Sequence, residues 1–176
     1  MANSMYSKGR EAFLEGDFDA LSATIALSLV TTGYTPNLAT DQYYNIISGG
    51  NIVAGPVTLT SVTGSAGTLS AANTSFSSVS GSTASYLVLF QNTGTSSTSA
   101  LIGLIDTASG LPVTPNGGTI VVAWASGQVF TLFEGLPESE KGKLKRFRDW
   151  LRDVARIPAK LGPGGLYLPE PRIVLV

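Results

Sequence analysis

The sequence predicts a mainly β protein: an antiparallel β-sandwich or barrel of about 7–8 strands with a short N-terminal helix, plus a C-terminal amphipathic helix and extended arm. Three observations lead to this fold class. Short apolar or alternating segments recur between turns rich in Gly, Pro, Ser and Thr. Residues 42–105 contain no charged side chain, and charged residues become frequent again from Glu134 onward. The 176 residues are enough for one globular domain with a terminal extension.

Residues 4–15, SMYSKGREAFLE, are predicted to form a short helix. Ser4 or Ser7 can cap its first turn, and Gly16 can end it in a left-handed conformation. A helix of this length is marginal in isolation, so we expect it to pack against the rest of the protein.

Two kinds of strand pattern follow. Residues 25–30 alternate, with Ile25, Leu27 and Leu29 on one face. The continuous apolar runs 86–90 and 100–105 are typical of strands buried on both faces. Shorter extended segments are expected at 57–60, 76–79, 120–124 and 129–133.

Turn signals separate these segments. Thr40 can cap a short helical turn over residues 41–47, whose tyrosines are expected to close one end of the core. Reversals of the chain are expected at Gly64 and Gly67, within 112–118 (where Asn116-Gly117 tolerates positive φ), and at Ser126-Gly127.

The composition changes at Glu134, which divides the chain into a β domain over 1–133 and a C-terminal part over 134–176. The spacing predicts a helix from Pro137 to Ile157, ended by Pro158. Its apolar stripe, flanked by Trp150, consists of Leu144, Phe147, Leu151 and Val154. A Gly-rich joint at 161–165 then leads to an extended arm from Leu166 to Val176, which could add to a sheet edge elsewhere.

The composition argues against an enzyme. The chain has no His and no Cys, so it offers no imidazole base, thiol nucleophile or thiolate metal site. An acidic cluster of Glu11, Glu15, Asp17 and Asp19 does not follow the spacing of a calcium-binding loop. We therefore expect no catalytic residue, no cofactor and no metal.

The charges are unevenly distributed. Residues 1–133 carry two basic and six acidic side chains, whereas 134–176 carry nine basic and six acidic ones. Soluble monomers usually place charges on exposed strands, and here Ser and Thr replace them. Either the protein is simply a Thr-rich β domain, or its surface is largely covered by other subunits. Nucleic-acid binding by the basic helix is disfavoured because Asp149 and Asp153 interrupt it.

No membrane or export segment is expected. The longest apolar stretch, around Ile25 to Val30, is far shorter than the ~20 residues of a spanning helix. Charged residues from Lys8 onward interrupt the N-terminus, so synthesis in the cytoplasm is expected.

Three segments carry a resemblance: MANSMYSKGREAFLEGD, then ATIALSLVTTGYTPNLATDQYY, and later LIGLIDTASGLPVTPNGGTIVVAW. Together they resemble a family of small virion structural proteins of tailed bacteriophages. The resemblance covers about residues 1–133. The segment GDFDALSA departs from the acidic and aromatic turn usual at that position, and residues 134–176 lie outside it.

The resemblance implies a non-enzymatic virion protein, expected at the capsid surface as a decoration or cement subunit. It would bind the major capsid protein lattice and other copies of itself, in a homo-oligomer such as a trimer. Neither a membrane nor a small-molecule substrate is expected. The side chains expected at subunit interfaces are Phe147, Trp150, Leu151, Tyr167, Ile173 and Leu175. Two alternatives stay open: a neck or tail component, and a carbohydrate-binding adhesin using Tyr34, Tyr43 and Tyr44.

Overall fold

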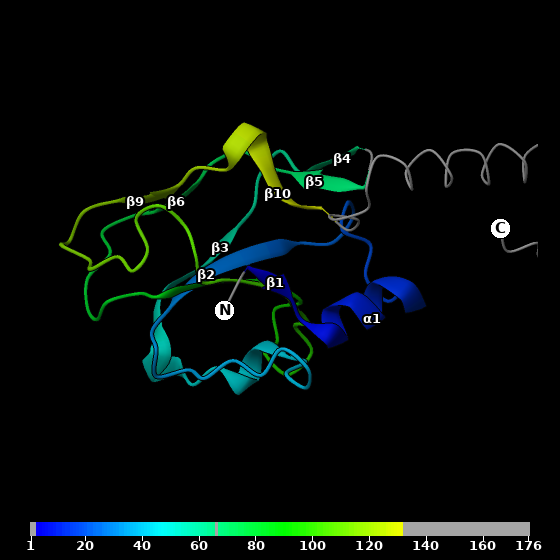
Figure 1. Cartoon of the computed structure of the whole chain (residues 1–176), viewed down its shortest axis with the longest axis horizontal. Coiled ribbons are helices and arrows are strands. Elements are labelled where there is room, and N and C mark those ends of the chain that lie inside the picture. Colours follow the sequence, from blue (N-terminus) through cyan, green and yellow to red (C-terminus); the bar gives the residue numbers. More distant parts are fainter. Residues whose placement is uncertain (1–2, 66, 132–176) are drawn as a thin grey trace, which may run out of the picture. The chain divides into compact units, whose positions relative to one another are not determined.

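A five-stranded antiparallel sheet forms the centre of the protein (Figure 1). The computed structural model describes residues 3–65 and 67–131. The strands of this main sheet, in spatial order, are β1 (Ser4–Met5), β8 (Leu101–Ile105), β7 (Tyr86–Gln91), β2 (Ile25–Val30) and β3 (Ile52–Thr58). Its two edge strands are poor templates for further pairing, because β1 has only two residues and β3 contains Pro56, which lacks an N–H.

Two smaller sheets lie on one side of the main sheet (Figure 1). One has the order β10 (Gln128–Thr131), β5 (Thr68–Ser70), β4 (Thr63–Ser65), and the other pairs β6 (Thr74–Phe76) with β9 (Ile120–Val122). All their pairings are antiparallel. The predicted mainly β class with antiparallel sheets and one short helix is confirmed. The described residues form ten strands rather than 7–8, because β1, β4 and β5 are too short to produce a sequence period.

The strand β2 lies between two hydrophobic cores. Ile25, Leu27 and Leu29 point into the core shared with the smaller sheets. Ala26 and Val30 point into a second core on the opposite face. The alternation predicted for this strand is therefore present, with both of its faces buried rather than one.

Residues 31–51 cover the second face of the main sheet (Figure 1). The Tyr44 ring stacks on Phe90 with 3.9 Å between ring centroids, and its hydroxyl lies 2.8 Å from the buried Ser28 hydroxyl. The predicted helical turn over 41–47 is a single 3-10 turn, Tyr44–Ile46, followed by a second at Gly49–Asn51. This segment covers a face of the sheet rather than closing the end of a core.

The helix α1 spans Ser7–Glu15, because residues 4 and 5 pair with β8 instead of starting the helix. The predicted serine cap is absent: Tyr6 occupies the N-cap position without a side-chain hydrogen bond. Gly16 ends the helix at φ 79°, as the sequence predicts.

Close contact with β8 holds α1 in place. A Cβ atom on Gly9 would lie 2.5 Å from the carbonyl oxygen of Leu101 and 3.1 Å from the Cα of Ile102. Only glycine permits this approach, because both neighbouring atoms belong to the backbone.

Predicted turns are confirmed by positive φ angles at Gly117, Ser126 and Gly127. The last predicted strand is β10, which begins one residue earlier than expected. The C-terminal domain over 134–176, its helix over 137–157 and its arm over 166–176 lie outside the described residues.

We predict that Gly9→Ala destabilises the protein by about 1–3 kcal/mol. Helix propensity alone favours alanine by about 1 kcal/mol, but the clash with the β8 backbone outweighs it. Urea unfolding measures the difference in free energy of unfolding. Gly49→Ala is the matched control, since a Cβ atom at that position would have no neighbour within 4 Å. A Gly9→Ala protein as stable as the control would contradict close packing of α1.

Candidate interaction surface

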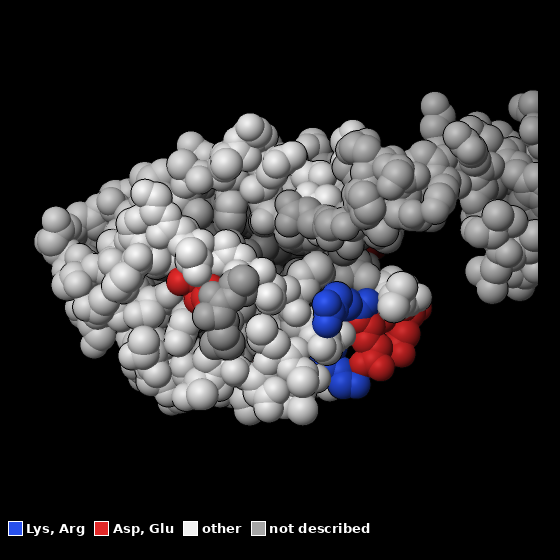
Figure 2. All heavy atoms as spheres, viewed as in Figure 1, with Lys and Arg blue, Asp and Glu red and all other residues white. Residues whose placement is uncertain are grey.

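Charged side chains gather over α1 and the turn after it (Figure 2). Of the charged residues in the described part of the chain, only Asp41 and Asp106 lie elsewhere in the sequence. The others are Lys8, Arg10, Glu11, Glu15, Asp17 and Asp19. Most of the other described residues in this view are uncharged (Figure 2).

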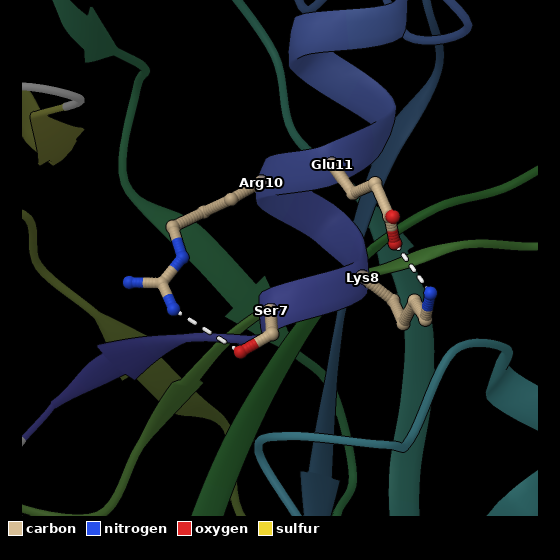
Figure 3. A network of polar contacts seen from close by, with 4 residues as sticks. All are labelled: Ser7, Lys8, Arg10 and Glu11. Carbon is tan, nitrogen blue, oxygen red and sulfur yellow. Dashed lines mark hydrogen bonds and ion pairs between the residues drawn. The ribbon is translucent and has the colours of Figure 1, made fainter.

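Both cations of this region are engaged within α1 (Figure 3). Lys8 forms an ion pair with Glu11, and this contact raises the pKa of the lysine. Arg10 donates a hydrogen bond of 3.1 Å to the Ser7 hydroxyl on another side of the helix (Figure 3). Within residues 3–65 and 67–131, no lysine or arginine forms an ion pair with Glu15 or Asp17. The end of α1 therefore presents an excess of negative charge.

Asp19 shapes the turn after α1. Its carboxylate accepts hydrogen bonds from the Leu21 N–H and the Ser22 hydroxyl, at 3.0 and 2.8 Å. These bonds, the Leu21 bond foremost, lower the pKa of Asp19. The bonded turn leaves Leu21 with 60% of its surface exposed.

Leu21 forms one side of an apolar groove of about 260 Å³ between α1 and the β4–β5–β10 sheet. The other apolar side chains that line this groove are Phe13, Ala20, Leu69 and Phe130. The Phe13 ring packs edge-on against Phe18 and Phe130, with centroid distances of 4.4 and 6.0 Å. The groove is thus an apolar surface, and no acidic side chain of the described residues lines it.

A second, polar hollow of about 180 Å³ lies against another side of α1. Carboxylates from α1 and the following turn line it, together with Lys8, and amide and hydroxyl groups come from Gln42, Gln91 and Thr98. Tyr43 contributes its ring, and 36% of this residue is exposed. The hollow can donate and accept many hydrogen bonds, but it holds little apolar surface.

Buried tyrosines connect α1 with the segment that covers the second core. The Tyr6 and Tyr34 hydroxyls lie 3.0 Å apart, and Tyr34 donates a 2.6 Å bond to Asp41. Burial raises the pKa of Tyr6, Tyr34 and Tyr44. For Tyr34, the hydrogen bond to Asp41 raises the pKa further. These hydroxyls remain protonated donors in the folded protein at neutral pH.

The side chains expected at subunit interfaces, Phe147, Trp150, Leu151, Tyr167, Ile173 and Leu175, all lie outside the described residues. Of the three tyrosines considered for carbohydrate binding, Tyr34 and Tyr44 are buried in the second core. Only Tyr43 presents its ring to solvent, so the three do not form one exposed aromatic patch.

The apolar groove was not predicted from the sequence. Its walls come from Phe13, Leu21 and Phe130, which no local pattern connects. The available signal was Leu21, an apolar residue within the otherwise polar and small-residue segment after the helix.

The described ranges 3–65 and 67–131 contain no group of three or more carboxylates placed to hold a metal ion. In the same ranges, no helix combines the length and hydrophobicity needed to span a bilayer.

Comparison of the whole chain with protein-family models and with curated proteins gave no match.

We predict that alkaline pH unfolds the protein through its buried tyrosines. Because the folded state keeps protons that the unfolded state loses above pH 10, stability falls as pH rises through and above that value. Each such tyrosine lowers the free energy of unfolding by up to about 1.4 kcal/mol per pH unit. Urea unfolding between pH 9 and 11 measures this slope.

The double variant Tyr44→Phe with Ser28→Ala is the matched control. It removes the Tyr44 hydroxyl together with its hydrogen-bond partner, the Ser28 hydroxyl. The dependence of the free energy of unfolding on pH should therefore become less steep, by the contribution of one tyrosine. Equal slopes in the wild type and the double variant would contradict the raised pKa of Tyr44.

Proposed function

We propose that this protein is a non-enzymatic bacteriophage virion structural protein, a capsid decoration or cement subunit that binds the major capsid protein lattice and stabilises the head. Its place is the capsid surface, alongside other copies of itself. The motif resemblance over residues 1–133 first suggests this role.

The observation that carries the proposal is the neutral surface of the β body. Residues 42–105 supply β3 to β8 without one charged side chain, and their exposed positions are mostly Ser, Thr, Asn and Gly. A surface without charges has little to prevent contact with other proteins, which suits a subunit that is covered by neighbours. In a symmetric shell, many weak copies of one contact add up to firm attachment.

The composition supports a structural rather than a catalytic role. The sequence has no His and no Cys, so neither an imidazole base nor a thiol can activate a substrate. The buried tyrosine hydroxyls are held by each other, by Asp41 and by Ser28, an arrangement that stabilises the fold.

A carbohydrate-binding adhesin is a second candidate, favoured by the polar hollow beside α1. Amides, carboxylates and the exposed Tyr43 ring are groups that bind sugar hydroxyls and sugar faces. The hollow contains only one exposed aromatic ring, which makes this candidate weaker than the assembly role.

We predict that virions of the phage encoding this chain contain it in a copy number of the same order as their major capsid protein. A shell-covering subunit follows the symmetry of the lattice, so its copy number scales with that of the capsid protein. Quantitative mass spectrometry of purified particles measures the ratio, and cryo-electron microscopy locates the subunit.

A ratio corresponding to a few copies per particle would assign the protein to the neck or tail instead. Complete absence from the particles would refute a virion role.

For the adhesin candidate, a glycan array separates the two functions. Under the assembly proposal we expect no saturable binding of any oligosaccharide. Binding that is lost in Tyr43→Ala and kept in Ile46→Ala would replace assembly by carbohydrate recognition. Ile46 is a suitable control because it is also exposed but does not line the hollow.

A further inference from the structure

We propose that Asn116 and Gly117 form a site of spontaneous deamidation that the folded turn keeps closed. The side-chain amide of Asn116 becomes a carboxylate only in molecules in which this turn has opened. The inference concerns the covalent chemistry of the β body and goes beyond the proposed function.

The sequence contains one dipeptide that is well suited to this reaction. Deamidation begins when a backbone nitrogen attacks the side-chain carbonyl carbon of the preceding asparagine, and a side chain on the attacking residue obstructs the approach. Glycine has no Cβ atom, so it obstructs the approach least. Asn116 is the only asparagine of the chain that precedes glycine, since the other six precede Ser, Thr, Leu or Ile.

The reaction needs only water and hydroxide as co-reactants. Hydroxide removes the amide proton of Gly117, and the nitrogen forms a bond to Cγ of Asn116. The bond from Cγ to Nδ2 then breaks, ammonia leaves, and a cyclic succinimide remains. Water opens this ring at either of its carbonyl groups, which yields aspartate or isoaspartate.

The folded turn exposes the asparagine to solvent. Asn116 is an exposed residue, and its Oδ1 accepts a 3.0 Å hydrogen bond from the Gly118 N–H. Gly117 has a φ of 84°, the left-handed conformation that glycine adopts readily. Access of water to this turn therefore does not limit the reaction.

The attacking nitrogen is restrained instead. The Gly117 N–H donates a 2.8 Å hydrogen bond to the Val79 carbonyl, and the Val79 N–H donates a 2.9 Å bond to the Gly118 carbonyl. Val79 is 3% exposed and belongs to the core shared with the smaller sheets, so packing fixes its position. Removal of the Gly117 proton would break one of these bonds and leave two electron-rich atoms facing each other.

Opening of the turn therefore controls the rate of deamidation. An opening that breaks both bonds with Val79 releases the Gly117 nitrogen. When opening and closing are fast relative to the chemistry, the rate of modification follows the fraction of open molecules. The same opening exposes the Gly117 amide to hydrogen exchange, which measures it independently.

The modified turn cannot return to its original structure. Isoaspartate lengthens the main chain by one methylene group, so Gly117 and Gly118 cannot both keep their bonds to Val79. Either product also adds a carboxylate to residues 107–131, which contain no charged side chain. Deamidation thus permanently marks molecules whose turn has opened.

The test keeps the full-length protein at one mildly alkaline pH, either native or unfolded in guanidinium chloride. Peptide mass spectrometry measures aspartate and isoaspartate at position 116. We expect deamidation to be at least about tenfold faster in the unfolded chain, which corresponds to a free energy of opening of about 1.4 kcal/mol or more.

Asn37 and Asn92 are matched internal controls. Each accepts the same kind of hydrogen bond from the N–H two residues later, but they precede Leu and Thr instead of Gly. Both should remain unmodified in the native and the unfolded sample over the same period.

A pair of valine variants tests the role of the turn. Val79→Ala loosens the packing behind the turn, so it should accelerate native deamidation and Gly117 hydrogen exchange several-fold, with no change in the unfolded chain. Val88→Ala removes the same two methyl groups from the second core and should deamidate like wild type. The wild-type comparison remains decisive if either variant fails to fold by circular dichroism.

Three outcomes overturn the inference. They are equal rates in native and unfolded wild type, an unmodified Asn116 in the unfolded chain, and equal acceleration by both valine variants, which would assign the reaction to global unfolding. The copy number in virions, which decides the proposed function, is independent of all three.

Discussion

The burial of β2 from both sides is the constraint on which the rest of the body depends. A strand with two covered faces needs one partner layer for each, and the chain supplies the smaller sheets for one face and residues 31–51 for the other. Ser28 places a hydroxyl inside the second core, where an unpaired polar group costs about 1–3 kcal/mol. The Tyr44 hydroxyl satisfies it, which connects the covering segment to the centre of the sheet.

The covering segment also fixes α1, and with it the only strongly charged region described. Tyr6 precedes the helix and joins Tyr34 and Asp41 in one hydrogen-bonded chain, and the Ser7 N–H donates to the Leu38 carbonyl. The helix therefore occupies a defined position relative to the sheet. Its Phe13 forms a wall of the apolar groove, whereas Glu11 and Glu15 line the polar hollow on another side of the helix.

Local sequence signals predicted the mainly β class, the helix end at Gly16 and the turns at Gly117 and Gly127. The alternation of apolar residues and the tolerance of glycine for positive φ depend only on neighbouring residues in the chain. The helix start was not, since pairing of Ser4 and Met5 with β8 overrides local capping and is a long-range event. The strand β4, Thr63–Ser65, has no apolar residue and was expected as a turn. The groove depends on Phe13, Leu21 and Phe130 meeting across the fold, which no sequence pattern records.

The two edges of the main sheet disfavour strand pairing with another molecule. Residues 3–6 occupy the outer side of β8: the Tyr6 N–H donates to Ile102, and the Asn3 side chain bonds the backbone at positions 106 and 107. At the opposite edge, Pro56 interrupts the row of donors on β3. Neither edge strand presents an uninterrupted row of free backbone groups with which a strand of another molecule could pair. Two folded molecules that meet edge to edge therefore cannot readily extend the main sheet across both chains, which protects the protein from amyloid-like stacking.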